Sequence, residues 1–186
     1  MRGFDRAYSF GFYEGPLRKL IHLFKYSGIR PLGKTLAGLL LKALPDDEDF
    51  DVVMPMPLHW RRLWKRGFNQ SELLASLVAK EQHVPMGKAV KRIRATAVQA
   101  GLTNSKRRKN VAGAFRVCSR KLIAGKRILL IDDVMTTGAT ASACASVLKR
   151  AGARSVTLLT LARVDRRFAH VQSAVMQKPA FKDTER

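Results

Sequence analysis

The stretch ILLIDDVMTTGAT, residues 128–140, places four apolar residues before two adjacent aspartates and follows them with threonines around a glycine. Such an apolar run is typical of a strand that is buried on both faces. The segment 137–153 has the composition of a helix that ends at Gly152. The stretch therefore predicts a strand, a tight turn and the first turn of a helix.

This predicted turn combines two kinds of chemistry. The unpaired N–H groups at a helix N-terminus bind phosphate, and Gly138 allows close approach of the backbone. Asp132 and Asp133 would repel that phosphate, so we expect them to face vicinal ribose hydroxyls, which donate hydrogen bonds, or a divalent cation. The pattern favours a ribose 5-phosphate. The competing interpretation, in which the acids merely cap the helix, accounts poorly for two adjacent acids before a Thr-Gly turn.

Hydrophobic periodicity predicts the elements on either side of this turn. Strands and helices alternate, which indicates an α/β fold with a mostly parallel open sheet flanked by helices, and ligands bind such sheets at the carboxyl ends of the strands. We expect one domain over residues 1–163 and a partly ordered tail over 164–186. The predicted helices are 15–28, 31–44, 69–83 and 137–153, and the predicted strands are 51–58 (ending near Met54), 84–94, 126–132 and 155–163.

The chain of 186 residues has a net charge of +21, and the excess is regional. The segment 59–127 contains eighteen Lys or Arg residues against two Glu residues, which predicts an anionic partner such as a phosphorylated small molecule, a nucleic acid or an acidic protein. A solvated surface is the alternative. Trp60, Trp64 and Phe68 recur every four residues in this segment, and we favour packing on one helix face over a nucleic-acid stacking platform.

Two cysteines without a CxxC pair, and four scattered histidines, give no metal-binding spacing. The N-terminal residues lack the apolar core of a signal peptide, and the most apolar run, 36–44, is too short to cross a bilayer. We therefore expect a cytoplasmic protein without membrane insertion.

ILLIDDVMTTGAT resembles the signature of the type I phosphoribosyltransferases at every position. The resemblance implies that Asp132 and Asp133 act catalytically at the ribose hydroxyls of phosphoribosyl pyrophosphate (PRPP), with Mg²⁺ accompanying the substrate. Hypoxanthine-guanine enzymes have a further aspartate, which acts as a base, where this chain has Thr136, so a 6-oxopurine acceptor is not expected. The residues implied to hold the 5-phosphate are Thr136, Thr137, Gly138, Ala139 and Thr140.

Three further segments make the chain similar to the ComF-like branch of that superfamily: YEGPLRKLIHLFKYSG (13–28), VVMPMPLHWRRLWKRGFNQS (52–71) and RATAVQAGLTNSKRRKNVAGAF (94–115). This resemblance implies that the loop 55–68 meets the pyrophosphate and that a mobile hood, about 95–113, closes over the site. The implied anion contacts are Arg61, Arg62, Lys65 and Arg66, and the hood residues at family landmarks are Arg94, Gln99, Arg107 and Asn110.

The resemblance implies a PRPP-binding protein that transfers a phosphoribosyl group and releases pyrophosphate. The alternative that it leaves open is a non-catalytic competence protein that binds single-stranded DNA, with PRPP as a regulatory ligand. Many ComF-like proteins begin with a four-cysteine zinc module that has no counterpart in this sequence, which is either truncated or from a member without the module, so we expect no structural zinc. A homodimer is plausible by resemblance.

Overall fold

The computed structural model describes residues 3–26, 29–94 and 113–164. Strands and helices alternate along much of the chain, as the sequence predicts. The strands are β1 (Arg6–Phe12), β2 (Val52–Pro55), β3 (Val90–Arg92), β4 (Phe115–Val117), β5 (Arg127–Met135) and β6 (Ser155–Arg163). The helices are α1 (Gly15–Tyr26), α2 (Leu32–Lys42), α3 (Trp60–Arg66), α4 (Gln70–Glu81) and α6 (Ala139–Arg150).

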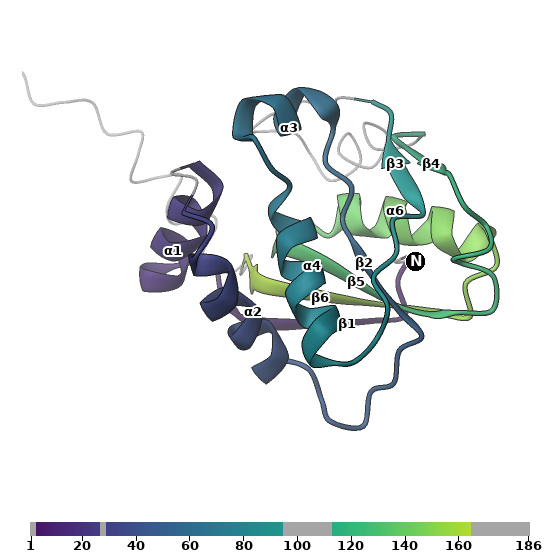
Figure 1. Cartoon of the computed structure of the whole chain (residues 1–186), viewed down its shortest axis with the longest axis horizontal. Coiled ribbons are helices and arrows are strands. Elements are labelled where there is room, and N and C mark those ends of the chain that lie inside the picture. The colour runs from purple at the N-terminus through teal and green to yellow at the C-terminus, as the bar shows by residue number, and fades with distance from the viewer. Residues whose placement is uncertain (1–2, 27–28, 95–112, 165–186) are drawn as a thin grey trace, which may run out of the picture.

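Four strands form one parallel sheet in the order β1-β6-β5-β2 (Figure 1). Since all four strands run in the same direction, the residues that follow β2 and β5 emerge at the same edge of the sheet. Strands β3 and β4 form a separate antiparallel pair. The predicted α/β fold with a mostly parallel sheet is confirmed.

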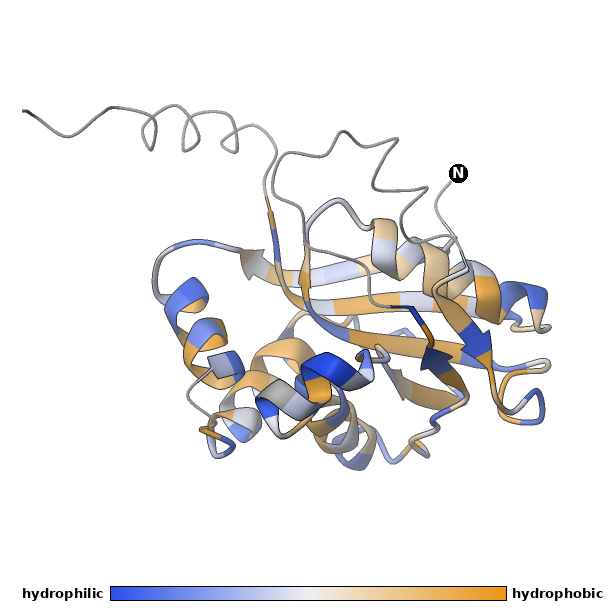
Figure 2. Cartoon of the chain, turned by 90° about the horizontal axis from the view of Figure 1, so that it is seen from above, coloured by the Kyte–Doolittle hydropathy of each residue, from blue (hydrophilic) through white to orange (hydrophobic). Residues whose placement is uncertain are grey.

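Helices cover both faces of the sheet, which explains the continuous apolar run of β5. Alternate residues of a strand point to opposite faces. Ile128 and Leu130 join a core with α6, whereas Leu129 and Ile131 join a second core with α1, α2 and α4. Figure 2 shows α6 on one side of the mostly orange strands and the other long helices on the opposite side. Strand β5 therefore has no polar face before its carboxyl end.

Strand β5 ends three residues later than the sequence predicts, because its pairing with β6 continues beyond the acids. Asp132 lies opposite Thr160, and Met135 lies opposite Arg163. Asp132 and Asp133 therefore lie in the last residues of the strand and do not follow it. This placement gives both acids the fixed backbone of a paired strand.

The structure corrects three further predictions. Strand β1 has no counterpart in the prediction, because it is an edge strand whose residues are partly exposed. The basic segment after β2 contains helix α3, which His59 caps by accepting from the Arg61 N–H (3.3 Å) and which ends at Gly67 with φ of +74°. Strand β4 lies in a segment for which no element was expected.

The aromatic residues of α3 do not pack as expected. Trp60 is 63% exposed and Trp64 is 89% exposed, so the prediction of helix-face packing is wrong for both. Phe68, beyond the end of the helix, does pack: its ring lies 5.6 Å from that of Phe24. The seven-residue helix is too short and too basic to bury a face of its own.

Candidate functional site

The two acids are held by residues from two helices. Asp132 Oδ1 accepts hydrogen bonds from Ser71 Oγ (3.2 Å) and from the Asp133 N–H (3.0 Å). Asp133 Oδ1 forms an ion pair with Lys25 Nζ at 2.9 Å. The N-terminus of α4 and the C-terminus of α1 therefore both contact the carboxyl end of β5.

The electrostatic environment of Asp132 is unusual for a carboxylate. Burial, followed by the charge of Asp133, raises the pKa of Asp132 to about 7 from its ordinary value of 3.8. Lys25, the Asp133 N–H and Ser71 act in the opposite direction on this pKa. The contacts of Asp132 therefore influence how readily its carboxyl group ionises.

The turn after β5 has the geometry of an anion cradle. Gly138 precedes α6 with φ of +74°, a left-handed conformation that glycine adopts without strain. Helix α6 begins at Ala139, whose N–H donates to Thr137 Oγ1 at 3.3 Å. Thr136 is exposed, and Thr137 and Thr140 are partly exposed. Hydroxyls and helix N–H groups thus lie within a few residues of the two acids.

The motif RGFNQS, residues 66–71, places Ser71 beside the acids. Asn69 caps α4 by accepting from the Ser71 N–H (3.1 Å), and its amide donates to the Met56 carbonyl at 3.2 Å. The second contact attaches the start of α4 to the chain that follows β2. The buried Ser71 is thereby fixed at hydrogen-bonding distance from Asp132.

The predicted pyrophosphate contacts lie on α3 but do not all point to one place. Arg66 donates to Gln70 Oε1 (3.2 Å) and stacks on Tyr26, whereas Arg61 stacks on Trp60 at 5.3 Å. Arg62 is partly exposed, and Lys65 lies in α3. The structure therefore brings Arg66 toward α1 and the acids' supporting residues, and leaves Arg61 with the exposed tryptophan.

Of the predicted hood residues, only Arg94 can be placed. It is exposed and lies two residues after the end of β3. Gln99, Arg107 and Asn110 lie outside the described residues, as does most of the segment 95–113. Their assignment remains a prediction.

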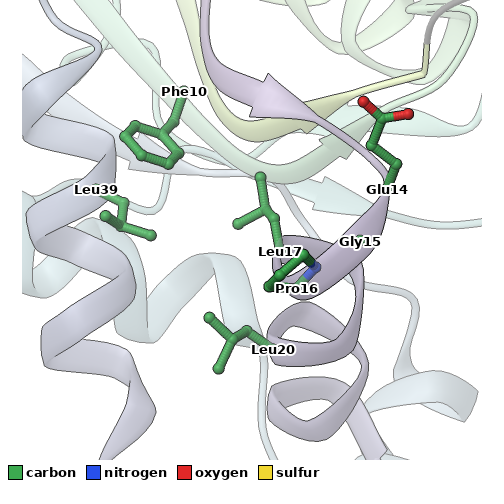
Figure 3. A pocket seen from close by; sticks show the side chains of 7 residues that line it. All are labelled: Phe10, Glu14, Gly15, Pro16, Leu17, Leu20 and Leu39. Atoms are coloured by element: carbon green, nitrogen blue, oxygen red, sulfur yellow. The ribbon is translucent and has the colours of Figure 1, made fainter.

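Among the residues that the structure describes, cavities also lie outside the acidic turn. The groove in Figure 3, of about 650 Å³, runs between β1, α1 and α2 and has Glu14 as its one charged lining residue, so it does not suit an anion. A second cavity of about 610 Å³ lies between the end of β2, α3, β3 and α6. Its wall is mostly apolar but includes Asn69 and Arg92, and Arg92 interacts electrostatically with Asp132. The second cavity is therefore the one coupled to the acids.

Within residues 3–26, 29–94 and 113–164, no three His, Cys, Asp or Glu side chains are grouped so that they could bind a metal ion. In the same ranges, no helix has the length and apolar character needed to cross a membrane. Cys118 is exposed and Cys144 is buried, and both are free thiols.

Sequence reasoning missed Lys25, Gln70 and Ser71, which support the acids. All three lie in the segments FKYSG and NQS of the quoted landmarks, but neither periodicity nor charge distinguishes them from their neighbours. Lys25 is 108 residues from Asp133 in the chain, so only the fold reveals their contact. A clue in the sequence was that the polar residues Gln70 and Ser71 begin a helix whose other buried positions are apolar.

Comparison with known proteins identifies a family and several relatives of this chain. The family model "Phosphoribosyl transferase domain" matches residues 69–178. The chain is 33% identical to competence protein F of Haemophilus influenzae, over 86% of this chain and 73% of that protein. It is 36% identical to the DNA utilization protein YhgH of Escherichia coli K12, over 81% of this chain and 69% of that protein.

Among solved structures, a glutamine PRPP amidotransferase from B. subtilis superposes with a TM-score of 0.45 and 22% identity, over 72% of this chain and 26% of that one. The family match covers the start of α4, the acidic pair and the turn 136–140, the same segments that meet at the sheet edge. The resemblance seen in the sequence is thus confirmed. This chain belongs to the phosphoribosyltransferase family, in the group that includes competence protein F.

Proposed function

We propose that this protein binds PRPP and transfers its phosphoribosyl group to a nucleophile with release of pyrophosphate. The observation that carries the proposal is the junction of an acidic pair and an anion cradle at the carboxyl edge of a parallel sheet. The turn 136–140 would hold the 5-phosphate, and the carboxylates of Asp132 and Asp133 would accept hydrogen bonds from the ribose hydroxyls. One ligand with both groups satisfies both halves of the site.

The proposed transfer breaks the bond between the anomeric carbon and pyrophosphate and forms a bond to the incoming nucleophile. Positive charge develops on the ribose as this bond breaks, and the two carboxylates would stabilise it electrostatically. Arg61, Arg62, Lys65 and Arg66 are the candidates for holding the pyrophosphate. The cavity of about 610 Å³ beside Arg92 is the space that an acceptor could occupy.

Magnesium would offset the negative charge of the departing pyrophosphate when it enters with PRPP. The carboxylates available for it at the site are those of Asp132 and Asp133, and each has a protein contact through its Oδ1 atom. The described residues thus favour an ion bound mainly through the substrate's own oxygens.

The test is PRPP turnover with Mg²⁺ across a panel of bases and amines, measured as pyrophosphate release. The variant Asp132→Asn/Asp133→Asn should lose at least a hundredfold in turnover, because neutral amides stabilise developing positive charge poorly. Asp46→Asn/Asp47→Asn is the control, since it removes the same number of charges from a second adjacent pair of acids, which is exposed in the turn after α2. The control should keep wild-type turnover.

Two results would decide against the proposal in different ways. Tight PRPP binding without turnover on any acceptor would leave a PRPP-binding protein that is not an enzyme. Absence of PRPP binding to the wild-type chain, measured by calorimetry, would refute the assignment of the site itself.

A second candidate function is binding of single-stranded DNA, and the exposed face of α3 favours it. Trp60, Leu63 and Trp64 are all exposed, and Arg61 lies over the Trp60 ring at 5.3 Å. Exposed aromatic rings beside cationic side chains are the features that bind single strands, because every base has a face that stacks. The names of the relatives, a competence protein and a DNA utilization protein, are consistent with this function.

Fluorescence anisotropy with a labelled oligothymidine tests this second function. Trp60→Ala/Trp64→Ala should weaken binding roughly tenfold or more, since stacking contributes about 1–3 kcal/mol per base. Phe10→Ala removes an exposed ring from β1, at the opposite edge of the sheet from β2, and should have no effect. Affinity should also fall steeply with salt, and a flat salt response would count against binding through phosphates.

A further inference from the structure

Lys25 reaches the acidic pair from a helix that lies far from it in the chain. It lies near the end of α1, and its Nζ is 2.9 Å from Asp133 Oδ1. The side chains of Lys25 and Asp133 are only 14% and 13% exposed. An ammonium group and a carboxylate are rarely buried to this extent unless they are paired.

The charges around Asp132 and Asp133 give the contact with Lys25 an electrostatic effect on both acids. Two adjacent carboxylates in a partly buried position repel each other and lose hydration, which favours their protonated form. The charged or titratable groups that face them are Lys25 on α1, Arg92 on β3 and Cys144 on α6. Of these, Lys25 makes the direct ion pair with the acids, and its charge lowers the pKa of Asp132.

The start of helix α4 contacts both Lys25 and the acidic pair. Gln70 Nε2 donates to the backbone carbonyl of Lys25 (3.4 Å), and Gln70 Oε1 accepts from Arg66 at 3.2 Å. The neighbouring residue, Ser71, donates to Asp132. Adjacent residues of one helix start therefore fix the backbone of Lys25 and the carboxylate of Asp132. This network also includes Arg66, a candidate pyrophosphate contact.

We propose that Lys25 is a positioning residue of the ribose site: it acts through Asp133, balances the charge of the acidic pair and fixes its orientation for the sugar hydroxyls. The proposal rests on the PRPP-binding function above. It extends the site to α1, which lies before the segment that the family model matches. The competing explanation is a purely structural ion pair between α1 and β5, which would support the fold but not affect how the acids ionise.

The two explanations differ in pH dependence. The variants are Lys25→Met, Lys25→Arg and, as control, Lys19→Met, which removes an exposed lysine from the same helix. Calorimetry measures PRPP affinity at pH 7.5 and pH 9. Lys25→Met should bind at least tenfold more weakly than wild type at pH 7.5, and the difference should shrink by pH 9, where the acids ionise without help. Lys25→Arg should stay within about threefold of wild type, and Lys19→Met should be unchanged.

A second measurement needs no ligand. Carbon-13 NMR of the aspartate carboxyl groups in the free proteins should show the acidic pair of Lys25→Met titrating at higher pH than in wild type. An unchanged titration, or an equal loss of affinity at both pH values without rescue by arginine, would overturn the proposal. If wild type fails to bind PRPP, the proposed function is wrong, whereas the titration still decides the role of Lys25. Lys25→Gln replaces Lys25→Met if the latter does not fold.

Discussion

The end of β5 and helix α3 both carry predicted site residues near the same edge of the sheet, yet they are built in opposite ways. Leu129, Leu130 and Ile131 before the acids are at most 1% exposed, whereas Trp64 on α3 is 89% exposed. The acids are held by a paired strand and by contacts from α1 and α4. In α3, the side chains of Trp60, Arg61 and Trp64 are exposed to solvent. The comparison indicates that the core fixes the position of the acids, while α3 offers a surface that can change without loss of the fold.

A direct test of this difference is the effect of truncation on stability. Leu130→Ala should lower the free energy of unfolding by about 3 kcal/mol, because it leaves a cavity in a closely packed core. Trp64→Ala should change it by less than about 0.5 kcal/mol, although it removes a larger side chain, because the ring is exposed. Urea denaturation of both variants measures the two values. A cost for Trp64→Ala similar to that for Leu130→Ala would mean that α3 is packed against something in solution.

Two glycines sharpen the comparison at the level of the backbone. Gly138→Ala should destabilise the protein by about 1–2 kcal/mol, because its φ of +74° is strained for any residue with a Cβ atom. It should also weaken PRPP binding, since the turn must distort. Gly38→Ala is the control: it lies in α2 with open space around the added Cβ, and should stabilise by about 0.5–1 kcal/mol. Thermal melts compare the two, and equal effects of the same sign would contradict a strained turn at Gly138.

The parts of the fold that the sequence predicted are those with a buried, periodic pattern. Strand β5 is recognisable because it packs into a core on each face and is therefore continuously apolar, and helix α6 because its buried residues lie on one side. Strand β1 was missed because an edge strand buries too little for a clear alternation, and α3 because its seven residues are too few for a clear helical period. Local sequence patterns therefore predicted the elements that pack into the cores and failed for the elements that lie at the surface.

The same distinction applies to the site. Asp132, Asp133 and the Thr-Gly turn form one continuous motif, so the sequence was sufficient to predict them as a unit. Lys25 and Ser71 contact the acids across 108 and 61 residues of chain. Contacts of that range depend on the packing of α1 and α4 against the sheet, which no local pattern encodes. The position of the motif in the fold was thus predictable, while the residues that contact it from other elements were not.

The smallest expected effect is on the free energy of unfolding, to which the burial of Asp132 makes a pH-dependent contribution. Because the pKa of Asp132 is about 7 in the folded protein and 3.8 ordinarily, the folded state retains its proton over a pH range in which the unfolded chain has released it. Stability from this group is therefore present at low pH and is lost as the pH rises toward about 7. Asp132→Asn removes that loss, and its amide oxygen can still accept from Ser71. At pH 8 the variant should be more stable than wild type by on the order of 1 kcal/mol, even though PRPP binding is lost.

Thermal unfolding of wild type and Asp132→Asn from pH 4.5 to pH 8 measures this effect. The stability difference should be small at pH 4.5 and should grow as the pH rises, which a difference in packing alone would not do. Asp46→Asn, at an exposed acid of the turn after α2, should show no such trend. A constant difference across the pH range, or a less stable variant at pH 8, would mean that Lys25 and Ser71 already compensate fully for the burial of the charge. A growing difference would show that this position keeps an ionised acid at a cost in stability, as expected of a residue selected for binding and not for folding.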